Sequence, residues 1–261
     1  RAAARGCRGI LPAAAAPPAP RPTALPEPLL IRPAQLSTAA GTRPLAGLPA
    51  PLPLDELVPG GGDWEVEIGF GKGRYLLARA AGDPSRRFLG VEIAGEYERL
   101  FVHRARRRGL ANWLSLRGEA LYLADAVLPR GFARALHVYF PDPWPKARHH
   151  KRRLFDPQTV DLVLGLLAPG GRISFATDFL DYGALVEGLL RSYPAVTVER
   201  LDGGWPEGPR TNYEAKYVAE GRPILRLAGT VAYDPAAGLP LHPDGARAVL
   251  AATAPPPGED D

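Results

Sequence analysis

From Asp63 to Leu227 the sequence alternates between short apolar runs and longer stretches with apolar residues at helical spacing. Short β-branched and aromatic runs bounded by Gly or polar residues are typical of buried strands, and the longer stretches are typical of helices. Strands that alternate with helices need right-handed crossovers, which produce a mostly parallel sheet with helices on both faces. The sequence therefore predicts an α/β fold.

The expected elements follow one another closely along this part of the chain. Strands are predicted at residues 64–69, 88–92, 113–117, 135–140, 172–177, 195–200 and 223–227, the last two as an antiparallel pair. Helices are predicted at residues 72–81, 95–108, 120–127, 157–167 and 180–192. For the fourth of these helices, Asp156 is the expected N-cap and Pro157 the first helical residue, because an amide at that position needs no partner.

Composition separates this region from the two ends of the 261-residue chain, because the 30 prolines are concentrated before residue 60 and after residue 233. We expect a Pro/Ala-rich leader over residues 1–60 that is largely disordered or extended, a folded domain over residues 61–232, and a Pro-rich tail over residues 233–261. Residues 29–57 are given no regular structure. Cys7 is the only cysteine, which excludes an intrachain disulfide and favours a reducing compartment.

The densest chemistry lies at residues 140–153, which read Phe-Pro-Asp-Pro-Trp-Pro-Lys-Ala-Arg-His-His-Lys-Arg-Arg. Each proline fixes its own φ and favours an extended conformation in the residue before it, so Asp142 and Trp144 are expected to project from a stiff, extended segment. The segment begins at the carboxyl end of a predicted strand, where open α/β sheets bind ligands. The pattern predicts a reaction pocket beside a polyanion. An Asx-type turn at Asp142 is the alternative that needs no ligand.

The first predicted strand leads into Glu-Ile-Gly-Phe-Gly-Lys-Gly at residues 67–73. Gly69 and Gly71 allow a tight turn and let a ligand approach the following helix. The fingerprint of dinucleotide enzymes is broken, because Arg74 stands where its third glycine belongs. Glu67 fits a ligand with a cationic end, such as the amino group of an amino acid. A glycine-rich turn with a solvated Glu67 is the alternative.

Two further glutamates follow the next two strands. Glu92 ends the strand at 88–92, where a carboxylate accepts hydrogen bonds from the hydroxyls of a ribose or caps the next helix. Glu119 follows the strand at 113–117, where it accepts a hydrogen bond from an adenine amino group or complements the dipole of a helix. An amino group, a ribose and an adenine all occur in S-adenosylmethionine. Together with Glu67, these residues predict a site for that cofactor.

With these motifs the chain resembles the bacterial tRNA (guanine-N7)-methyltransferase family. The resemblance covers about residues 63–230 and rests on the glycine loop at 67–73, on Phe140 to Lys146 with the basic residues after it, on Ala176-Thr177-Asp178 and on Thr211-Asn212-Tyr213-Glu214. It implies a Rossmann-like class I methyltransferase fold, with a mostly parallel seven-stranded sheet and helices on both faces. It also implies methyl transfer from S-adenosylmethionine to N7 of a guanine in tRNA.

The resemblance implies roles for individual residues. It places the cofactor beside Glu67, Gly69, Gly71, Glu92, Glu119 and Asp142. It places the nucleotide substrate beside Lys146, Asp178, Thr211, Asn212, Tyr213 and Glu214. Asp142 is the expected catalytic residue. Members of the family usually carry Asp or Asn where this chain has Glu119, so its contact with the adenine is expected to be longer or rearranged.

The chemistry of this reaction limits what the site must provide. N7 of guanine has a free lone pair, so no proton has to be removed and no general base is required. The site needs an in-line approach of N7 to the methyl carbon, and negative potential where the guanine ring becomes cationic. Asp142 is expected to supply that potential or to hold the Watson–Crick edge of the guanine, and Asp178 is placed to assist.

The cations after the proline segment are expected to contact tRNA phosphates, with an affinity that depends on salt. They are Arg148, Lys151, Arg152 and Arg153. A solvated charged surface is the alternative. Thr211 and Glu214 also match a capping box at a helix N-terminus, which explains them without a ligand.

The expected partner is tRNA, with no membrane and no metal, and the protein is expected to be a cytoplasmic monomer or homodimer. No apolar run approaches the ~20 residues that cross a bilayer, and His149 and His150 lack the spacing of a zinc site. The formal net charge of +4 is too small to establish an RNA partner by itself. Three other functions stay open: a methyltransferase acting on another RNA, an NAD-dependent oxidoreductase, and a non-catalytic RNA-binding protein.

Overall fold

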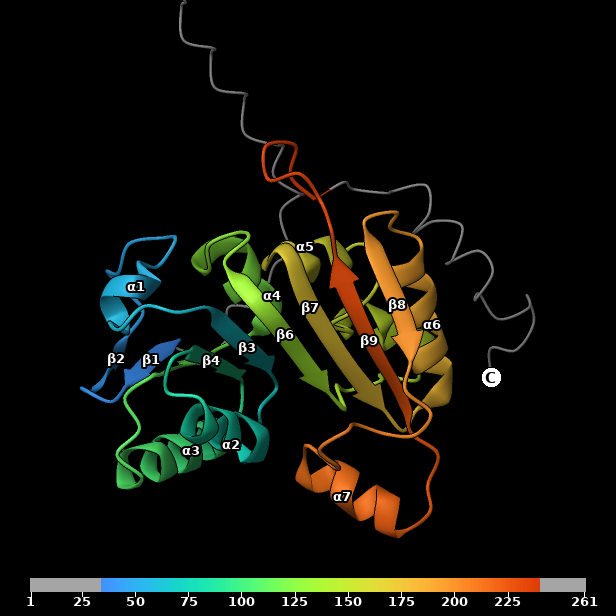
Figure 1. The fold of residues 1–261 in the computed structure, drawn as a ribbon, viewed down its shortest axis with the longest axis horizontal. Coiled ribbons are helices and arrows are strands. Elements are labelled where there is room, and N and C mark those ends of the chain that lie inside the picture. The colour runs from blue at the N-terminus through green and yellow to red at the C-terminus, as the bar shows by residue number, and fades with distance from the viewer. Residues whose placement is uncertain (1–33, 240–261) are drawn as a thin grey trace, which may run out of the picture.

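The predicted alternation of strands and helices is present in the structure, a computed structural model that describes residues 34–239. Among these residues, nine strands form one sheet with helices on both faces (Figure 1). The strands are β1 (Gln35–Thr38), β2 (Thr42–Pro44), β3 (Trp64–Ile68), β4 (Arg87–Glu92), β5 (Trp113–Arg117), β6 (Ala133–Tyr139), β7 (Leu167–Thr177), β8 (Val196–Arg200) and β9 (Leu225–Val231). The helices are α1 (Leu54–Leu57), α2 (Arg74–Gly82), α3 (Gly95–Arg107), α4 (Ala120–Tyr122), α5 (Val160–Leu164), α6 (Leu180–Arg191) and α7 (Asn212–Ala219), with a π-helical turn η1 (Leu123–Val127) and a 3-10 turn η2 (Ala147–Arg152).

The strands lie in the order β2-β1-β5-β4-β3-β6-β7-β9-β8. The five central strands, from β5 to β7, run parallel to one another. The predicted antiparallel pair at the end of the domain is confirmed, because β9 pairs with both β7 and β8 in that direction. The order of the strands along the chain reverses between β3 and β6, and open α/β sheets bind their ligands at such a reversal.

Burial explains the apolar character of the central strands. All five residues of β3 and all six of β4 are buried, as expected for parallel strands that helices cover on both sides. Helix α3 directs Phe101 and Ala105 into this core, where the ring of Phe101 meets that of Trp113 edge to face with 5.3 Å between centroids. No helix in the described part of the chain has the length and apolar character that a membrane crossing needs.

The prediction of no regular structure over residues 29–57 is wrong at β1, β2 and α1, and residues 45–53 form neither a helix nor a strand. β1 pairs antiparallel with β5, and β2 pairs with β1, so the sheet has nine strands and not the seven that the resemblance implied. An unpaired edge of β5 would expose backbone donors and acceptors, and β1 covers it. Leu36 on β1 is 2% exposed and joins the core. Strands of four and three residues are too short to give a periodic sequence signal.

Some predicted boundaries also differ. The helix predicted at residues 157–167 is the five-residue α5, because Asp156 Oδ1 accepts hydrogen bonds from the amides of Gln158 and Thr159 in a turn before the helix begins. The helix predicted at 120–127 is divided into α4 and the π-helical turn η1. The division into a leader, a domain and a tail stays a prediction, and residues 1–33, with Cys7, and 240–261 lie outside the described residues.

Leu36→Ala tests whether β1 belongs to the folded core. We expect this substitution to lower the free energy of unfolding by about 2–5 kcal/mol, because it removes a fully buried leucine side chain and leaves a cavity. Leu180→Ala is the matched control, since Leu180 is 45% exposed and its loss is expected to change stability by less than about 1 kcal/mol. Denaturant unfolding measures both, and equal midpoints for the two variants would contradict the packing of β1.

Candidate functional site

Five acidic residues lie at the carboxyl ends of five adjacent parallel strands. In the order of the sheet from β5 to β7 they are Glu119, Glu92, Glu67, Asp142 and Asp178. Glu92 is the last residue of β4, Glu67 lies one residue before the end of β3, and the others follow their strands within three residues. Because parallel strands end at the same edge of a sheet, the topology brings together acids that are up to about 110 positions apart in the sequence.

The glycine loop after β3 requires its glycines. Gly69, Gly71 and Gly73 have φ values of 75°, 52° and 70°, in the left-handed region that side chains disfavour. A Cβ at Gly73 would also lie 2.5 Å from the ring of Phe101. The loop therefore turns tightly above α3 and presents backbone at the edge of the sheet where the five acids lie.

Glu67 is buried without a cationic partner. It is 1% exposed, its carboxylate accepts one hydrogen bond, from the amide of Leu76 at 3.1 Å, and it makes no ion pair within residues 34–239. Burial, with a smaller contribution from the charge of Glu92, raises the pKa of Glu67 to about 8. A cationic ligand at this position would favour the ionised carboxylate. The alternative of a solvated Glu67 does not hold.

Glu92 connects the ends of two strands. Its Oε2 accepts a hydrogen bond from the amide of Gly71 at 2.8 Å, and its Oε1 accepts one from the amide of Ala94 at 2.9 Å. The N-cap of α3 is Ala94, and no side chain caps that helix, so the capping alternative for Glu92 is wrong. Glu92 holds the glycine loop in place, and each of its oxygens has a further lone pair for a ligand.

Glu119 caps a helix. Its two carboxylate oxygens accept hydrogen bonds from the amides of Leu121 at 3.1 Å and Tyr122 at 2.7 Å, which makes it the N-cap of α4. The alternative that placed Glu119 at the first turn of a helix is therefore confirmed. Its contact with an adenine stays a prediction.

The proline segment is not the straight, extended rod that the sequence predicted. Phe140 and Trp144 have φ values of 53° and 41°, although both precede a proline. The prediction of an extended Trp144 is wrong. Left-handed conformations in residues with a Cβ cost roughly 1–2 kcal/mol each and persist only where other contacts impose them. Asp142 lies between the two turns, is exposed, and makes no hydrogen bond or ion pair with the residues that the structure describes.

Arg153 is one of the contacts that hold this segment. Its Nε donates to the carbonyl of Pro143 at 2.7 Å and its Nη2 to the carbonyl of Trp144 at 3.3 Å, and its guanidinium lies 5.0 Å from the centre of the Tyr182 ring. Arg153 is only 8% exposed. It was predicted to contact phosphate, but its donors point into the protein, so this geometry gives it a structural role.

The other predicted phosphate contacts lie nearer the surface. Arg148 and Arg152 are exposed, and the guanidinium of Arg152 lies 4.9 Å from the centre of the Trp144 ring. Lys146 is exposed at the start of the 3-10 turn η2, which also contains the backbone of Lys151. This short segment therefore carries both exposed cations and the buried Arg153.

The motif at residues 211–214 begins a helix that the sequence analysis did not assign. Thr211 Oγ1 accepts a hydrogen bond from the amide of Glu214, which confirms the capping alternative for Thr211. Glu214 is fully buried, accepts from the amide of Arg210 at 2.8 Å and pairs with Arg226 at 2.6 Å. These contacts leave Glu214 within the protein, whereas Asn212 and Tyr213 are exposed.

An aromatic cluster, formed by the exposed Tyr213 and the partly buried Phe140 and Tyr217, lies beside Asp178. Ring centroids are 5.6 Å apart for Phe140 and Tyr217, and 6.5 Å apart for Phe140 and Tyr213. Arg222 lies 4.6 Å from the centre of the Tyr217 ring, and its Nη1 is 3.8 Å from Asp178 Oδ2. Exposed aromatic rings and a guanidinium group can stack on a nucleobase. The sequence pattern did not single out Tyr217 and Arg222, although the i, i+4 spacing of the two tyrosines was a usable signal.

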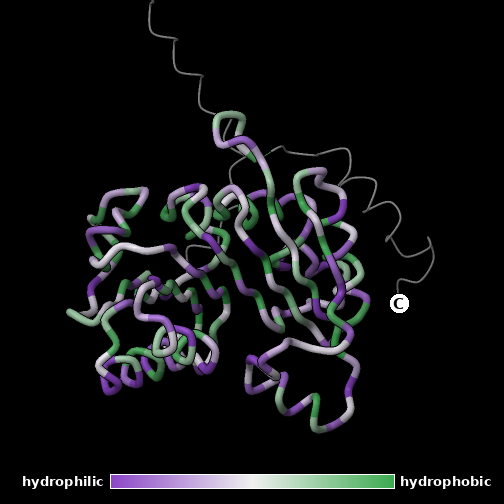
Figure 2. Tube along the Cα trace, in the orientation of Figure 1, coloured by the Kyte–Doolittle hydropathy of each residue, from purple (hydrophilic) through white to green (hydrophobic). Residues whose placement is uncertain are grey.

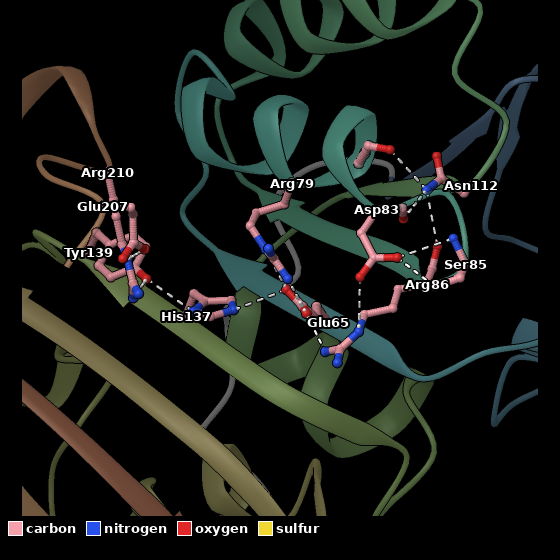
Figure 3. A network of polar contacts seen from close by, with 11 residues as sticks. Glu65, Arg79, Asp83, Ser85, Arg86, Asn112, His137, Tyr139, Glu207 and Arg210 are labelled. Atoms are coloured by element: carbon pink, nitrogen blue, oxygen red, sulfur yellow. Dashed lines mark hydrogen bonds and ion pairs between the residues drawn. The ribbon is translucent and has the colours of Figure 1, made fainter. Parts of the chain in front are cut away.

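A buried polar chain connects the sheet to the start of α7 (Figure 3). Glu65 pairs with Arg79 at 2.6 Å, His137 Nε2 lies 3.6 Å from Glu65, and His137 Nδ1 is 3.0 Å from the hydroxyl of Tyr139. Burial favours an ionisable group in its neutral form, but hydrogen bonds from Arg79, with His137 and Arg86 close by, outweigh this effect and hold the pKa of Glu65 well below its usual range. The opposite direction for Glu67, two residues later, follows from its lack of such partners.

Arg210 completes this chain. Its Nη1 donates to the hydroxyl of Tyr139 at 2.6 Å, its Nε donates to Glu207 at 2.6 Å, and its guanidinium lies 3.8 Å from the centre of the Trp205 ring. Its amide also binds the buried Glu214. The start of α7 is therefore fixed to β6 directly before the proline segment. Within residues 34–239, no three His, Cys, Asp or Glu side chains are grouped so that they could hold a metal.

The sequence is similar to those of known methyltransferases. A family model described as "Putative methyltransferase" matches residues 63–227. The tRNA (guanine-N(7)-)-methyltransferase of Alkalilimnicola ehrlichii is 35% identical over 71% of this chain and 78% of its own length, and that of Leifsonia xyli is 35% identical over 70% and 81%. The counterpart from Nitrosococcus oceani is 36% identical over 62% and 69%.

Solved structures confirm the fold. The aminoglycoside resistance methyltransferase NpmB1 superposes with a TM-score of 0.52 at 19% identity, and the 16S rRNA methyltransferase KamB with 0.54 at 15%. Each match covers 76% of this chain and all of the other. The Rossmann-like class I methyltransferase fold is thus confirmed, in a nine-stranded mixed form. From the matched domain and the similarity to these curated relatives, the chain belongs to the tRNA (guanine-N7)-methyltransferase family.

Proposed function

We propose that this protein transfers a methyl group from S-adenosylmethionine to N7 of a guanine in tRNA. The main structural support is that five acids from five separate strands lie at the sheet edge where such folds bind ligands. Membership of the family supports the substrate, since the curated relatives are named for it. The cytoplasm is the proposed compartment.

Two of the acids fit the charge and shape of the cofactor. The buried Glu67 has no ion pair in the described chain and accommodates the cofactor's amino group, and Glu92 has lone pairs to accept ribose hydroxyls. Gly69 and Gly71 bring backbone, without side chains, to the same place. When bound, the cofactor supplies an electrophilic methyl on a sulfonium. Glu119 has less hydrogen-bonding capacity left for the adenine, because its two oxygens already accept amides of α4.

The remaining residues serve the guanine. The lone pair of N7 attacks without loss of a proton, so the protein's task is orientation and electrostatic stabilisation. Asp142 is exposed, makes no hydrogen bond or ion pair with the other described residues and lies between two residues of positive φ, so its carboxylate can face the guanine as positive charge develops there. The aromatic cluster provides a surface on which the base stacks. Lys146, Arg148 and Arg152 contact phosphates.

Direct product analysis tests the proposal. Purified protein, S-adenosylmethionine and unmodified bulk tRNA should yield 7-methylguanosine in digests analysed by mass spectrometry. S-adenosylhomocysteine should raise the melting temperature, and NAD should not. Binding of tRNA without methyl transfer would support a non-catalytic RNA-binding protein instead, methylation confined to another RNA would support the first alternative, and a shift with NAD alone would support an oxidoreductase.

Asp142→Ala should lower kcat by about 10²–10³-fold, because it removes electrostatic stabilisation that is needed only as the guanine becomes cationic. Binding of tRNA should remain within about threefold of the wild type. Asp202→Ala is the matched control, since Asp202 is also exposed but lies in the loop after β8. Single-turnover rates and filter-binding affinities separate the two effects. An equal loss of binding and turnover would contradict the role given to Asp142.

Glu67 predicts a pH dependence of cofactor binding. The free protein holds a proton on Glu67 below a pH of about 8, because burial raises its pKa, and binding of a cationic amino group must release that proton. Affinity for S-adenosylhomocysteine should therefore rise with pH between 6 and 8. Calorimetry in buffers of different ionisation enthalpy should detect close to one proton released at pH 7. Glu67→Gln should bind more weakly and release none, whereas Glu96→Gln, at an exposed position, should behave as the wild type.

The pH dependence of stability, measured without a ligand, is a second test of the raised pKa of Glu67. The folded protein binds the Glu67 proton more tightly than the unfolded chain, whose pKa is near 4.5, so this contribution to stability is complete below pH 4.5 and is lost as pH rises to about 8. As the pH rises across that range, the free energy of unfolding of the wild type should therefore fall relative to that of Glu67→Gln. A difference that does not change with pH would show that Glu67 is not buried as described.

A further inference from the structure

A second cationic surface lies between α3 and the β1–β2 hairpin. A groove of about 600 Å³ opens there, and its lining includes Arg99, His103, Arg106 and Arg107 from α3, with Gln35 and Thr42 from the hairpin. The four basic residues are spaced by four, seven and eight positions, which places them on one face of the helix. We call this surface the α3 groove.

Most of these charges are not neutralised by the protein. Arg99, His103 and Arg107 are exposed, and none has a carboxylate within ion-pair distance in the described part of the chain. Arginines elsewhere on the surface commonly have one: Arg79 and Arg86 pair with Glu65, and Arg191 and Arg200 pair with Glu187. Figure 2 shows hydrophilic residues on the outer turns of α3. The α3 groove thus concentrates unpaired positive charge.

The groove is built by contacts that do not need a ligand. Arg106 Nη2 donates to the carbonyl of Thr38 at 2.9 Å and to Thr42 Oγ1 at 3.2 Å, so it fixes the hairpin to the helix. Glu98 is the one carboxylate among the lining residues, but it is 2% exposed and accepts hydrogen bonds from the hydroxyls of Ser37 at 2.8 Å and Ser115 at 3.3 Å. Its charge is thus turned toward the strands, and the exposed walls of the groove are cationic.

Two contacts connect this groove with the candidate cofactor site. Arg99 also lines a second groove of about 560 Å³ that includes Ile93, the residue after Glu92, and Arg117. On another side of α3, Arg104 Nη1 donates to the carbonyl of Lys72 in the glycine loop at 3.0 Å. Helix α3 therefore contacts the glycine loop and also lines the groove.

We propose that the α3 groove binds phosphates of the tRNA at a distance from the methylated guanosine. This inference rests on the proposed function. A line of unpaired arginines complements a phosphate backbone, and such contacts position an RNA without reading its sequence. Phosphate contacts outside the reaction site raise affinity for the whole tRNA and leave the chemical step unchanged.

Charge reversal at one exposed arginine tests the groove. Arg107→Glu should weaken binding of full-length tRNA by about tenfold and reduce the slope of log K against log salt by about one, because a phosphate contact is lost. The kcat at saturating tRNA should stay within twofold of the wild type. Arg172→Glu is the matched control, since Arg172 is exposed on β7 and has no carboxylate partner in residues 34–239, so the change in net charge is the same. Unchanged melting temperatures would establish that both variants fold.

A short RNA separates the groove from the reaction site. An oligoribonucleotide that contains only the methylated guanosine and its near neighbours should bind Arg107→Glu and wild type about equally. If Arg107→Glu binds full-length tRNA as Arg172→Glu does, or weakens the short RNA as strongly as the whole tRNA, the inference is wrong. Failure of the wild type to form 7-methylguanosine would instead remove the proposed function, while a selective loss of tRNA binding in Arg107→Glu would still support an RNA-binding groove.

Discussion

The parallel pairing of β3 with β4 on one side and β6 on the other determines where every candidate site residue lies. Ile68 pairs with Val91 and with Val138, so the three strands end at nearly the same level. The chain leaves β3 in one direction and β6 in the other, and the space between these two connections is where α/β sheets accept ligands. The acids lie at this edge because each is at, or within three residues of, the carboxyl end of its own strand.

Two glutamates on β3 show how partners decide the state of a buried carboxylate. Glu65 and Glu67 point to the same face of one strand and are both almost fully buried. Glu65 is surrounded by Arg79, Arg86 and His137, which stabilise its ionised form, whereas Glu67 receives one amide hydrogen bond. Glu65 is therefore paired by cations of the fold itself, whereas Glu67 makes no ion pair within residues 34–239 and is affected by Arg210 only at longer range.

The sequence alone predicted the central strands and the acids that lie at their carboxyl ends, because short apolar runs and the residues that end them are local signals. It could not predict β1 and β2, whose pairing depends on the free edge of β5, more than 60 residues away. The sequence grouped Arg153 with the surface cations, because a sequence shows that a side chain is charged but not whether it points into the protein. It also failed at Trp144, where a local preference for extended backbone is overridden by the contacts of Arg153 and the packing around the loop.

The strain at Phe140 and Trp144 gives this override a functional meaning. Two left-handed turns in residues that disfavour them cost roughly 1–2 kcal/mol each, and the hydrogen bonds from Arg153 to two carbonyls offset part of that cost. These contacts fix the backbone directly after Asp142, whereas its exposed side chain makes no hydrogen bond or ion pair with the described residues. The same segment continues into the exposed Arg148 and Arg152, so one short segment carries a carboxylate and two surface cations. Under the proposed function, a fixed backbone at this point would help to orient the guanine, and no general base would be needed, because attack by a free lone pair removes no proton.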